Sequence, residues 1–402
     1  MQTMQGIRVI EVAEWTFVPA AATVLADWGA EVLKIEHPEH GDGIRGLISS
    51  GIVPGAAGAN FFVEQQFRNK KSVGIDISTE TGREILYRLV EKADVFITSM
   101  LPDARERFGI TFEDIRKVNP KVIYAKGTGY GPKGPDSRRG GYDGLSFWMR
   151  GGPAASMTTP GEPFVMQRPA FGDFTGGMFI AGGIASALFH RERTGEAVEV
   201  DVSLLGQACW MLSPDMVASM LYGAELPKGN LLGAPNPLVA PYECADGKHL
   251  QIMMLQAEKF WPQFLDAIEL GHILEDERYD TPEKRAAASL ELHTTLTEHF
   301  RTRDRAVWMA ALQPTDCIFG AVQSPLEVAE DPQVAANQYI LPVDHPEYGE
   351  IRLTSSPVQF GGEPVEIRNA APEVGADTEL TLVDLGCSWD EIAAWKEKNV
   401  IS

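Results

Sequence analysis

Strand-like and helix-like segments alternate through the first third of the chain, and this alternation restricts the fold more than any other feature. Short β-branched runs at residues 7–12 and 31–36 enclose a helical segment at 19–28, which Gly29 ends. A strand–helix–strand unit of this kind predicts two parallel strands joined by a right-handed crossover. The alternation resumes at residue 72, so we expect an α/β protein with an open, doubly wound sheet.

Two glycine-rich stretches interrupt this alternation. Residues 37–68 have no helical or strand period, and we interpret them as a long loop that carries function or a partner surface. The stretch GTGYGPKG at 127–134 has the wrong glycine spacing for a dinucleotide loop and contains Pro132, so a turn is the better interpretation. No G-x-G-x-x-G follows the first strand, which disfavours an NAD-linked dehydrogenase.

The second half of the chain predicts a further, smaller unit. At 402 residues the chain is too long for one ordinary core, and we expect two domains. Residues 178–195 form an apolar Gly/Ala-rich run that predicts a buried helix, and 227–241 have the composition of a linker or crossing segment. After this linker, Asp246-Gly247 separates two strand-like runs and predicts a hairpin.

Composition and charge exclude several classes of function. The net charge of −21 disfavours nucleic acid as a partner, because a phosphate backbone requires a basic face. The longest apolar runs are too short to span a membrane, and the N-terminus enters a strand pattern without a signal peptide, so we expect a cytoplasmic protein. The cysteines are dispersed and predict neither a disulfide framework nor a metal site: Cys209, Cys244, Cys317 and Cys387.

Asp173 is the strongest candidate for a catalytic residue. It lies in FGDFTGG, after a Pro169-Ala170 turn and at or near the start of the predicted buried helix. A simple helix cap is the alternative, because Asp is among the best capping residues. The surrounding glycines cost backbone entropy that a cap does not need. We therefore favour a nucleophile, ionised at neutral pH with a reference pKa of about 3.9, with N–H groups at Gly176 and Gly177 stabilising an oxyanion.

Several stretches, in the same order along nearly the whole chain, resemble the class III coenzyme A transferases. This family includes formyl-CoA:oxalate transferase and the carnitine CoA-transferases, with α-methylacyl-CoA racemase as a side branch. The stretches that carry the resemblance are GIRVIEV, VLADWGAEVLKIEHPEHGD, NKKSVGIDISTETGREI, ADVFITSMLPDARERFGI, NPKVIYAKGTGYG, FGDFTGG, RTGEAVEVDVSLL, APYECADG and APEVGADTELTLVDLG.

The resemblance implies a specific architecture. A large Rossmann-like domain is built from both chain ends, residues 1–225 and the return segment 330–402. A smaller α+β middle domain occupies residues 226–329. Two subunits form a homodimer of interlocked rings.

The resemblance also assigns residues. It implies that Asp173 carries the acyl group and that coenzyme A binds at seven positions: Trp15, Thr16, Phe17, His37, Ile75, Ser78 and Arg107. Some members have Arg at the position of His37 and Lys at that of Ser78, so neighbouring basic residues could replace these phosphate contacts: Lys70, Lys71, Arg138 and Arg139. From the sequence alone, a core role for Trp15 and Phe17 and a solvated surface role for His37 and Arg107 stay open.

The function implied is transfer of coenzyme A from an acyl-CoA donor to a carboxylic acid acceptor, through an aspartyl anhydride and an aspartyl-CoA thioester. No cofactor beyond the thioester substrate is expected. A racemase acting by α-proton transfer is one alternative, but that branch uses a histidine in a G-H-D-x-N-Y stretch, where this chain has Tyr142. A CoA-binding protein without chemistry is the other. Apolar residues near Asp173 suggest a bulky acyl group: Trp148, Met149, Met157, Phe164 and Met166.

Overall fold

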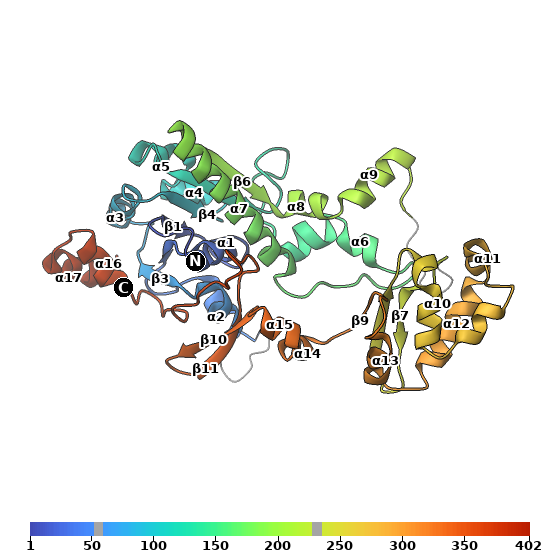
Figure 1. Ribbon diagram of the computed structural model, residues 1–402. Helices are drawn as coiled ribbons and strands as arrows, with labels where there is room; N and C mark the ends of the chain where they lie inside the picture. Colours follow the sequence, from blue (N-terminus) through green and yellow to red (C-terminus); the bar gives the residue numbers. More distant parts are fainter. Residues whose placement is uncertain (52–58, 227–234) are drawn as a thin grey trace. The chain divides into compact units, whose positions relative to one another are not determined.

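The computed structural model describes residues 1–51, 59–226 and 235–402, in two compact units (Figure 1). The first unit contains Met1–Thr158, Glu162–Leu226 and Pro332–Ser402, and the second contains Thr159–Gly161 and Pro227–Asp331. Residues 52–58 of the predicted loop and 227–234 of the predicted linker lie outside the described residues.

A six-stranded sheet, parallel throughout, organises the first unit, as the alternation of segments predicted. The strand order is β3-β2-β1-β4-β5-β6. Val9 in the central strand is in register with Val32 on one side and Val95 on the other. The strands are β1 (Arg8–Val12), β2 (Glu31–Glu36), β3 (Lys70–Gly74), β4 (Val95–Thr98), β5 (Ile123–Thr128) and β6 (Glu199–Ser203).

Each face of this sheet has its own core, because successive strand residues point to opposite faces. Val9 packs in a core with helices α1 (Phe17–Asp27) and α7 (Phe171–Thr194). Ile10, the next residue, packs on the opposite face with α3 (Glu80–Val90) and α5 (Phe112–Val118). Other helices of this unit, described between residues 100 and 226, are α4 (Pro102–Phe108), the π-helical turn η2 (Gly144–Met149), α6 (Pro153–Met157), α8 (Leu204–Met211) and α9 (Ser213–Tyr222).

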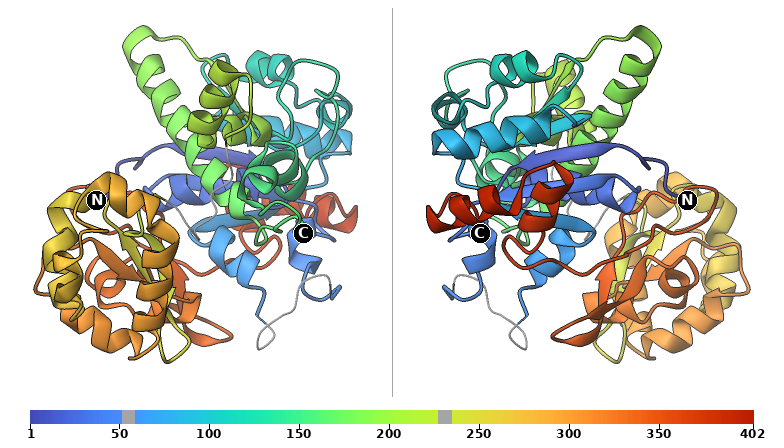
Figure 2. Two further views of the ribbon diagram at one scale, coloured as in Figure 1. Left: turned by 90° about the vertical axis from the view of Figure 1, so that its right-hand side faces the viewer. Right: turned by 90° about the vertical axis from the view of Figure 1, so that its left-hand side faces the viewer.

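The C-terminal residues form hydrogen bonds with the end of β3, the outer strand of the same sheet. The Asp76 N–H donates to the Val400 carbonyl over 2.8 Å, and the Gly74 N–H donates to Thr378 Oγ1 over 2.9 Å. Figure 2 shows the red C-terminal helices beside the blue N-terminal segments from two opposite sides. The elements of this return segment are α15 (Pro332–Ala336), β10 (Ile340–His345), β11 (Gly349–Thr354), α16 (Thr378–Asp384) and α17 (Trp389–Glu397).

Two stretches of the chain differ from the sequence prediction. The predicted loop at 37–68 contains the 3₁₀ turn η1 (Gly43–Gly46) and helix α2 (Phe61–Phe67), which the Asn60 side chain caps at its start. Helix α2 forms because its aromatic residues pack into a small core with Ile44 and Ala170. The buried helix predicted at 178–195 begins earlier, at Phe171, so the whole FGDFTGG stretch is helical, and the prediction that Asp173 lies at or near a helix start is confirmed.

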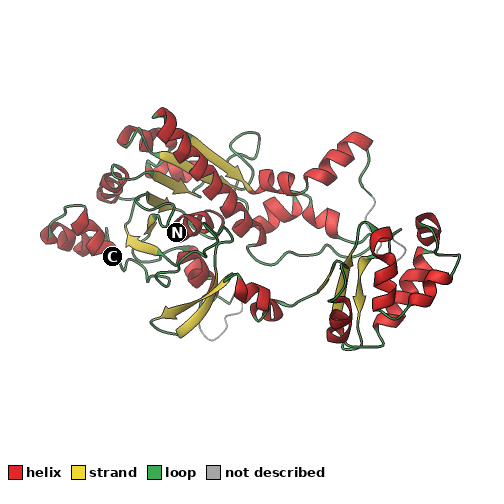
Figure 3. Ribbon diagram, in the orientation of Figure 1, coloured by secondary structure: helices red, strands yellow, loops and turns green. Residues whose placement is uncertain are grey.

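The second unit is built on a three-stranded antiparallel sheet, β7 (Val239–Glu243), β8 (His249–Met253) and β9 (Phe319–Ala321). The predicted hairpin at Asp246-Gly247 is confirmed, since β7 and β8 pair and Gly247 has a left-handed φ of 72°. Helices α10 (Ala257–Ala267), α12 (Ser289–Phe300) and α13 (Arg305–Leu312) share the core of this sheet, and Figure 3 shows them in red beside its yellow strands. The same unit contains η3 (Gly271–Glu275), α11 (Pro282–Ala287) and α14 (Pro325–Ala329).

Candidate active site

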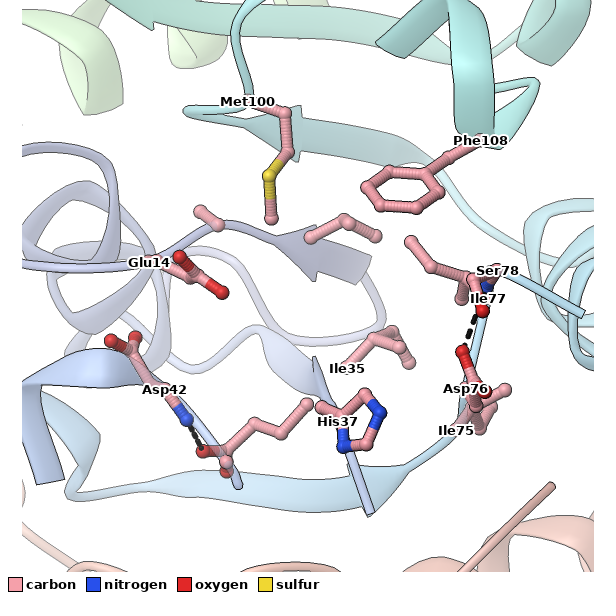
Figure 4. A pocket seen from close by; sticks show the side chains of 14 residues that line it. Glu14, Ile35, His37, Asp42, Ile75, Asp76, Ile77, Ser78, Met100 and Phe108 are labelled. Carbon is pink, nitrogen blue, oxygen red and sulfur yellow. Dashed lines mark hydrogen bonds between the residues drawn. The ribbon is translucent and has the colours of Figure 1, made fainter. Parts of the chain in front are cut away.

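A pocket lies at the carboxyl ends of the central strands of the first unit. In a doubly wound sheet this edge is where ligands bind, next to the point at which the strand order reverses, here between β1 and β4. Figure 4 shows the lining side chains converging from several strands. They are Val12, Ala13, Glu14, Ile35, Glu36, His37, Gly41, Asp42, Ile75, Asp76, Ile77, Ser78, Met100 and Phe108.

Three of the predicted CoA-binding residues, His37, Ile75 and Ser78, line this pocket together. Ile75 is buried, and its N–H donates to the Glu36 carbonyl over 2.8 Å. Ser78 is exposed at the rim, where its N–H donates to Asp76 Oδ1 over 2.9 Å. Met100 and Phe108 face these residues across the pocket and give it an apolar wall (Figure 4).

The pocket is unusually acidic for a site expected to receive phosphates. Four carboxylates line it, and His37 is the one residue among the described lining side chains that can carry a positive charge. Burial, followed by the Asp42 charge, raises the pKa of Glu14. The phosphate groups of a nucleotide would therefore be directed toward the rim, at Ser78 and beyond, and away from the carboxylates.

A buried network of charged side chains adjoins the pocket and shares Asp42 with it. Lys34 Nζ donates to Glu11 over 2.9 Å and to Asp42 over 2.8 Å, and Lys70 Nζ donates to Glu11 over 2.8 Å. Burial alone would lower the pKa of Lys34, but the surrounding carboxylates raise it; burial lowers the pKa of Lys70 to about 8 despite its partner Glu11. Lys70, which the sequence analysis proposed as a replacement phosphate contact, is thus buried and hydrogen-bonded to Glu11 within this network.

The network fixes the backbone at Trp15. Asp42 Oδ1 accepts the Trp15 N–H over 3.0 Å, and Trp15 has a left-handed φ of 68°, which is uncommon for a bulky residue. The indole ring is about one-third exposed and packs edge-on against Tyr142, with ring centroids 5.5 Å apart. Trp15 directly follows Glu14 of the pocket lining, and Tyr142 directly precedes Asp143 in the chain.

Asp173 lies in the first turn of α7, but it does not cap the helix. The cap position is Ala170, which has a left-handed φ of 61° and no side-chain cap, and Phe174 N–H donates to its carbonyl over 3.1 Å. The simple cap considered for Asp173 is therefore wrong, because the helix begins before it. Asp173 keeps part of its surface open to solvent.

Asp143 lies close to the start of α7. Its Oδ1 accepts the Gly144 N–H over 2.6 Å and so caps its own turn, η2, and the nearby backbone N–H groups of Gly172 and Asp173 act to lower its pKa. Burial nevertheless raises the pKa of Asp143 overall. Burial, together with the charge of Asp143, raises the pKa of Asp173 well above the ordinary value from which the sequence analysis started.

The glycines around Asp173 have a packing role. A Cβ at Gly176 would lie 2.2 Å from Gln207 Oε1 and 2.4 Å from the Phe17 ring, and one at Gly177 would lie 2.7 Å from Ala20 Cβ. Both residues lie in the second turn of α7, where helix geometry pairs each N–H with the carbonyl four residues earlier. Close contact between α1 and α7 explains both glycines, and their role toward an oxyanion stays a prediction.

The other predicted CoA-binding residues lie outside the pocket lining. Thr16 is buried at the start of α1, and Phe17 is a core residue packed against α7. Arg107 is exposed on α4, with its guanidinium 4.6 Å from the ring centre of Phe108, which does line the pocket. Arg138 makes ion pairs with Asp103 and Glu106, which both lie on α4.

Sequence reasoning missed the partner of Asp173. Asp143 lies in GYDG, an acid between glycines like Asp173 in its own stretch, and this shared pattern was the available signal. It also missed Asp42, which directs Trp15. No group of three His, Cys, Asp or Glu side chains suited to a metal ion occurs in the described residues. None of the described helices is both long enough and apolar enough to cross a membrane.

Comparison with known proteins decides the family. The family model described as CoA-transferase family III matches residues 4–378. The chain belongs to this family. The family resemblance noted from sequence is therefore confirmed, and the enzyme is a CoA-transferase that acts on an acyl-CoA and a carboxylic acid.

Relatives of known activity match over almost their whole length. The chain is 32% identical to (R)-2-hydroxy-4-methylpentanoate CoA-transferase of Clostridioides difficile, over 99% of both chains. It is 30% identical to cinnamoyl-CoA:phenyllactate CoA-transferase of Clostridium sporogenes, over 98% of this chain and 97% of the relative. A CAIB/BAIF family protein from Brucella suis has the same fold, with a TM-score of 0.81, 26% identity and coverage of 95% and 99%.

Proposed function

We propose that this CoA-transferase works through Asp173 as its covalent nucleophile. The carboxylate attacks the thioester carbonyl of an acyl-CoA, forming an aspartyl acyl anhydride and releasing CoA thiolate. The thiolate then attacks the aspartyl carbonyl, releasing the donor acid and leaving an aspartyl-CoA thioester. The acceptor carboxylate repeats these steps in reverse order, and free Asp173 is regenerated with the new acyl-CoA.

The observation that carries this mechanism is the setting of the Asp173 carboxyl. A partly buried acid beside the buried acid Asp143 is costly, and Asp173 is not needed to cap α7. A carboxylate with a raised pKa is more basic, and it is therefore a stronger nucleophile once ionised.

Coenzyme A is proposed to bind with its nucleotide end in the pocket at the strand ends. From there the pantetheine arm would pass the aromatic pair Trp15 and Tyr142 to reach Asp143 and Asp173. This route is supported by the backbone link from Glu14, which lines the pocket, to Trp15, whose ring contacts Tyr142. Arg107, beside the pocket on α4, is positioned for a phosphate at the rim.

A second copy of the chain is the proposed partner of the first unit. Helix α9 has no buried residue, and three consecutive apolar side chains at its end, Met220, Leu221 and Tyr222, are about three-quarters exposed. On α7, Phe171 and Phe189 are also exposed. Apolar surface of this extent favours an obligate interface, and the family resemblance proposes interlocked rings with the domains 1–225, 226–329 and 330–402. A cytoplasmic location stays a prediction.

The acceptor is proposed to be a 2-hydroxy acid with a bulky apolar side chain. Two relatives act on such acids by name, 2-hydroxy-4-methylpentanoate and phenyllactate. Apolar side chains surround the start of α7, including Trp148, which packs edge-on against Phe171 with centroids 6.2 Å apart. Phe164 and Met166 are exposed nearby in sequence and are available to a substrate or partner.

A transfer panel tests this function. The purified enzyme is incubated with one acyl-CoA donor and a series of carboxylic acids, and new CoA thioesters are identified by mass spectrometry. We expect transfer to branched and aromatic 2-hydroxy acids to exceed transfer to formate, oxalate or succinate by at least about tenfold. Equal transfer to all acids would contradict the acceptor class, and α-deuterium uptake by 2-methylacyl-CoA without any transfer would favour the racemase.

A further inference from the structure

A second cavity lies entirely within the second unit and shares no residue with the site around Asp173. It opens between the start of α10 and helix α11, and its volume is about 450 Å³. Small-molecule sites are commonly a few hundred Å³ in volume, with mostly apolar walls and few polar groups. Leu238, Leu255 and Trp261 form the apolar wall of this cavity.

The polar group at this cavity is a buried arginine. Arg285 is only 4% exposed, its Nη1 donates to the Tyr279 carbonyl over 2.6 Å, and its guanidinium lies 5.1 Å from the ring centre of Trp261. Burial lowers the pKa of Arg285, but an arginine remains charged in a protein at neutral pH. A buried positive charge of this kind requires an anionic partner.

Glu258 is the anionic partner of Arg285 in this structure, and another anion can readily displace it. It forms an ion pair with Arg285 Nη2, yet its side chain is 58% exposed at the rim of the cavity. An exposed carboxylate loses side-chain entropy when it is held in one position and gains little from the pair. An incoming carboxylate can therefore displace it while Glu258 turns toward water.

The start of α10 adds a second attraction for an anion. Gln256 occupies the cap position without a side-chain cap hydrogen bond, and Gln256, Ala257 and Glu258 all line the cavity. The first N–H groups of a helix have no partner within the helix and carry partial positive charge. A guanidinium and a helix start therefore meet at one end of an apolar cavity.

We infer that this cavity binds a small carboxylic acid with an apolar body, its carboxylate on Arg285 in place of Glu258 and its body against Trp261. Arginine binds a carboxylate with two parallel hydrogen bonds, which gives the site directional preference for acids over neutral analogues. The inference concerns a binding site and does not depend on the proposed chemistry at Asp173.

Calorimetric titration of the full chain with 3-phenylpropanoate tests the inference, with 3-phenylpropanamide as the neutral control. Glu258→Gln removes the competing carboxylate, and we expect about threefold or greater tightening of 3-phenylpropanoate binding. Arg285→Gln removes the guanidinium, and we expect at least about tenfold weakening, the scale of a lost charge-assisted hydrogen bond. Asp173→Asn should leave this affinity unchanged.

The two substitutions are expected to change the affinity for 3-phenylpropanoate in opposite directions, and this makes the test decisive. If Arg285→Gln fails to fold, the exposed Glu258 position alone decides, since tightening supports the site and an unchanged or weaker affinity overturns it. Equal binding of the amide also overturns it. Weakening by Asp173→Asn with no effect of either second-unit variant would place the acid at the active site, which refutes this inference and leaves the proposed function standing.

Discussion

The carboxyl groups of Asp143 and Asp173 are close enough for the charge of Asp143 to raise the pKa of Asp173. Asp143 precedes η2, whereas Asp173 lies in the first turn of α7, three residues after the cap position at Ala170. Burial and the neighbouring charge raise the pKa of Asp173. The charge of Asp143 thereby contributes to the pH at which Asp173 ionises.

The substitution Asp143→Asn should move the pH dependence of transfer. The nucleophile must be ionised, so kcat/KM rises with pH through the apparent pKa of the pair. Removing the Asp143 charge removes one cause of the raised pKa of Asp173, and the acidic limb should shift to lower pH. The measurement is kcat/KM between about pH 4 and 8. An acidic limb that stays in place or moves to higher pH would show that Asp143 does not act on Asp173 through its charge.

The contact between α1 and α7 predicts unequal effects of alanine at three glycines of one helix. Gly176→Ala and Gly177→Ala force a Cβ into Gln207 and Ala20 respectively, and each should cost about 1–3 kcal/mol of unfolding free energy. Gly182→Ala is the control, since nothing lies within 4 Å of the position that its Cβ would take, and the helix gains up to about 1 kcal/mol. Thermal unfolding of the three variants decides. Equal effects at all three positions would exclude close packing as the reason for the glycines.

Glu36 should stabilise the fold in a pH-dependent manner. Burial alone would raise the pKa of Glu36, but Arg45, Lys34 and Ser72 lower it to about 2. Because this folded-state pKa lies below the unfolded value, the unfolded chain binds more protons, and the stabilisation present above about pH 4.5 is lost as the pH falls toward 2.

The matched test is Glu36→Gln against the exposed Glu397→Gln. At pH 7 the first variant should lose on the order of 3 kcal/mol of unfolding free energy, and its difference from the wild type should shrink between about pH 4.5 and 2. The second should follow the wild type throughout. Denaturant unfolding at several pH values measures both. A pH-independent loss in Glu36→Gln would indicate a packing effect instead of an ionic one.

The acidic pocket predicts that an added cation at its rim improves CoA binding. Ser78→Lys places a positive charge at the exposed rim, where the phosphates are expected, and should lower KM for acyl-CoA by roughly three- to tenfold at low ionic strength. The gain should disappear in high salt, and kcat should change little. Ser78→Ala is the neutral control. An unchanged KM in Ser78→Lys at low salt would place the phosphates elsewhere.

The sequence predicted the parallel sheet because most of its strands are β-branched and several alternate with helices of clear period. It also placed Asp173 at or near a helix start, which is confirmed, but it missed α2 and the helical state of the whole FGDFTGG stretch. Helix α2 is short and stabilised by packing with Ile44 and Ala170, and no local signal reveals such contacts. FGDFTGG is rich in glycine, which disfavours a helix locally, but the close approach of α1 requires glycine at Gly176 and Gly177.

The candidate site was predictable only in part for a related reason. His37, Ile75 and Ser78 follow neighbouring parallel strands, so topology brings them to one edge of the sheet. Asp143 precedes η2 and Asp173 lies in α7, so their proximity depends on how the chain after β5 folds back to α7. The sequence shows each acid between glycines but does not show that they are neighbours.

Trapping of the covalent intermediate tests the proposed mechanism most directly. Hydroxylamine is added to the enzyme during turnover of an acyl-CoA, and the digested protein is examined by peptide mass analysis, with Asp173→Asn treated in parallel. We predict a hydroxamate on the peptide that carries Asp173, no such adduct in the variant, and a loss of transfer on the order of 10⁴-fold or more with little change in melting temperature. Near-normal transfer by Asp173→Asn, with no adduct at this residue in the wild type, would contradict the mechanism.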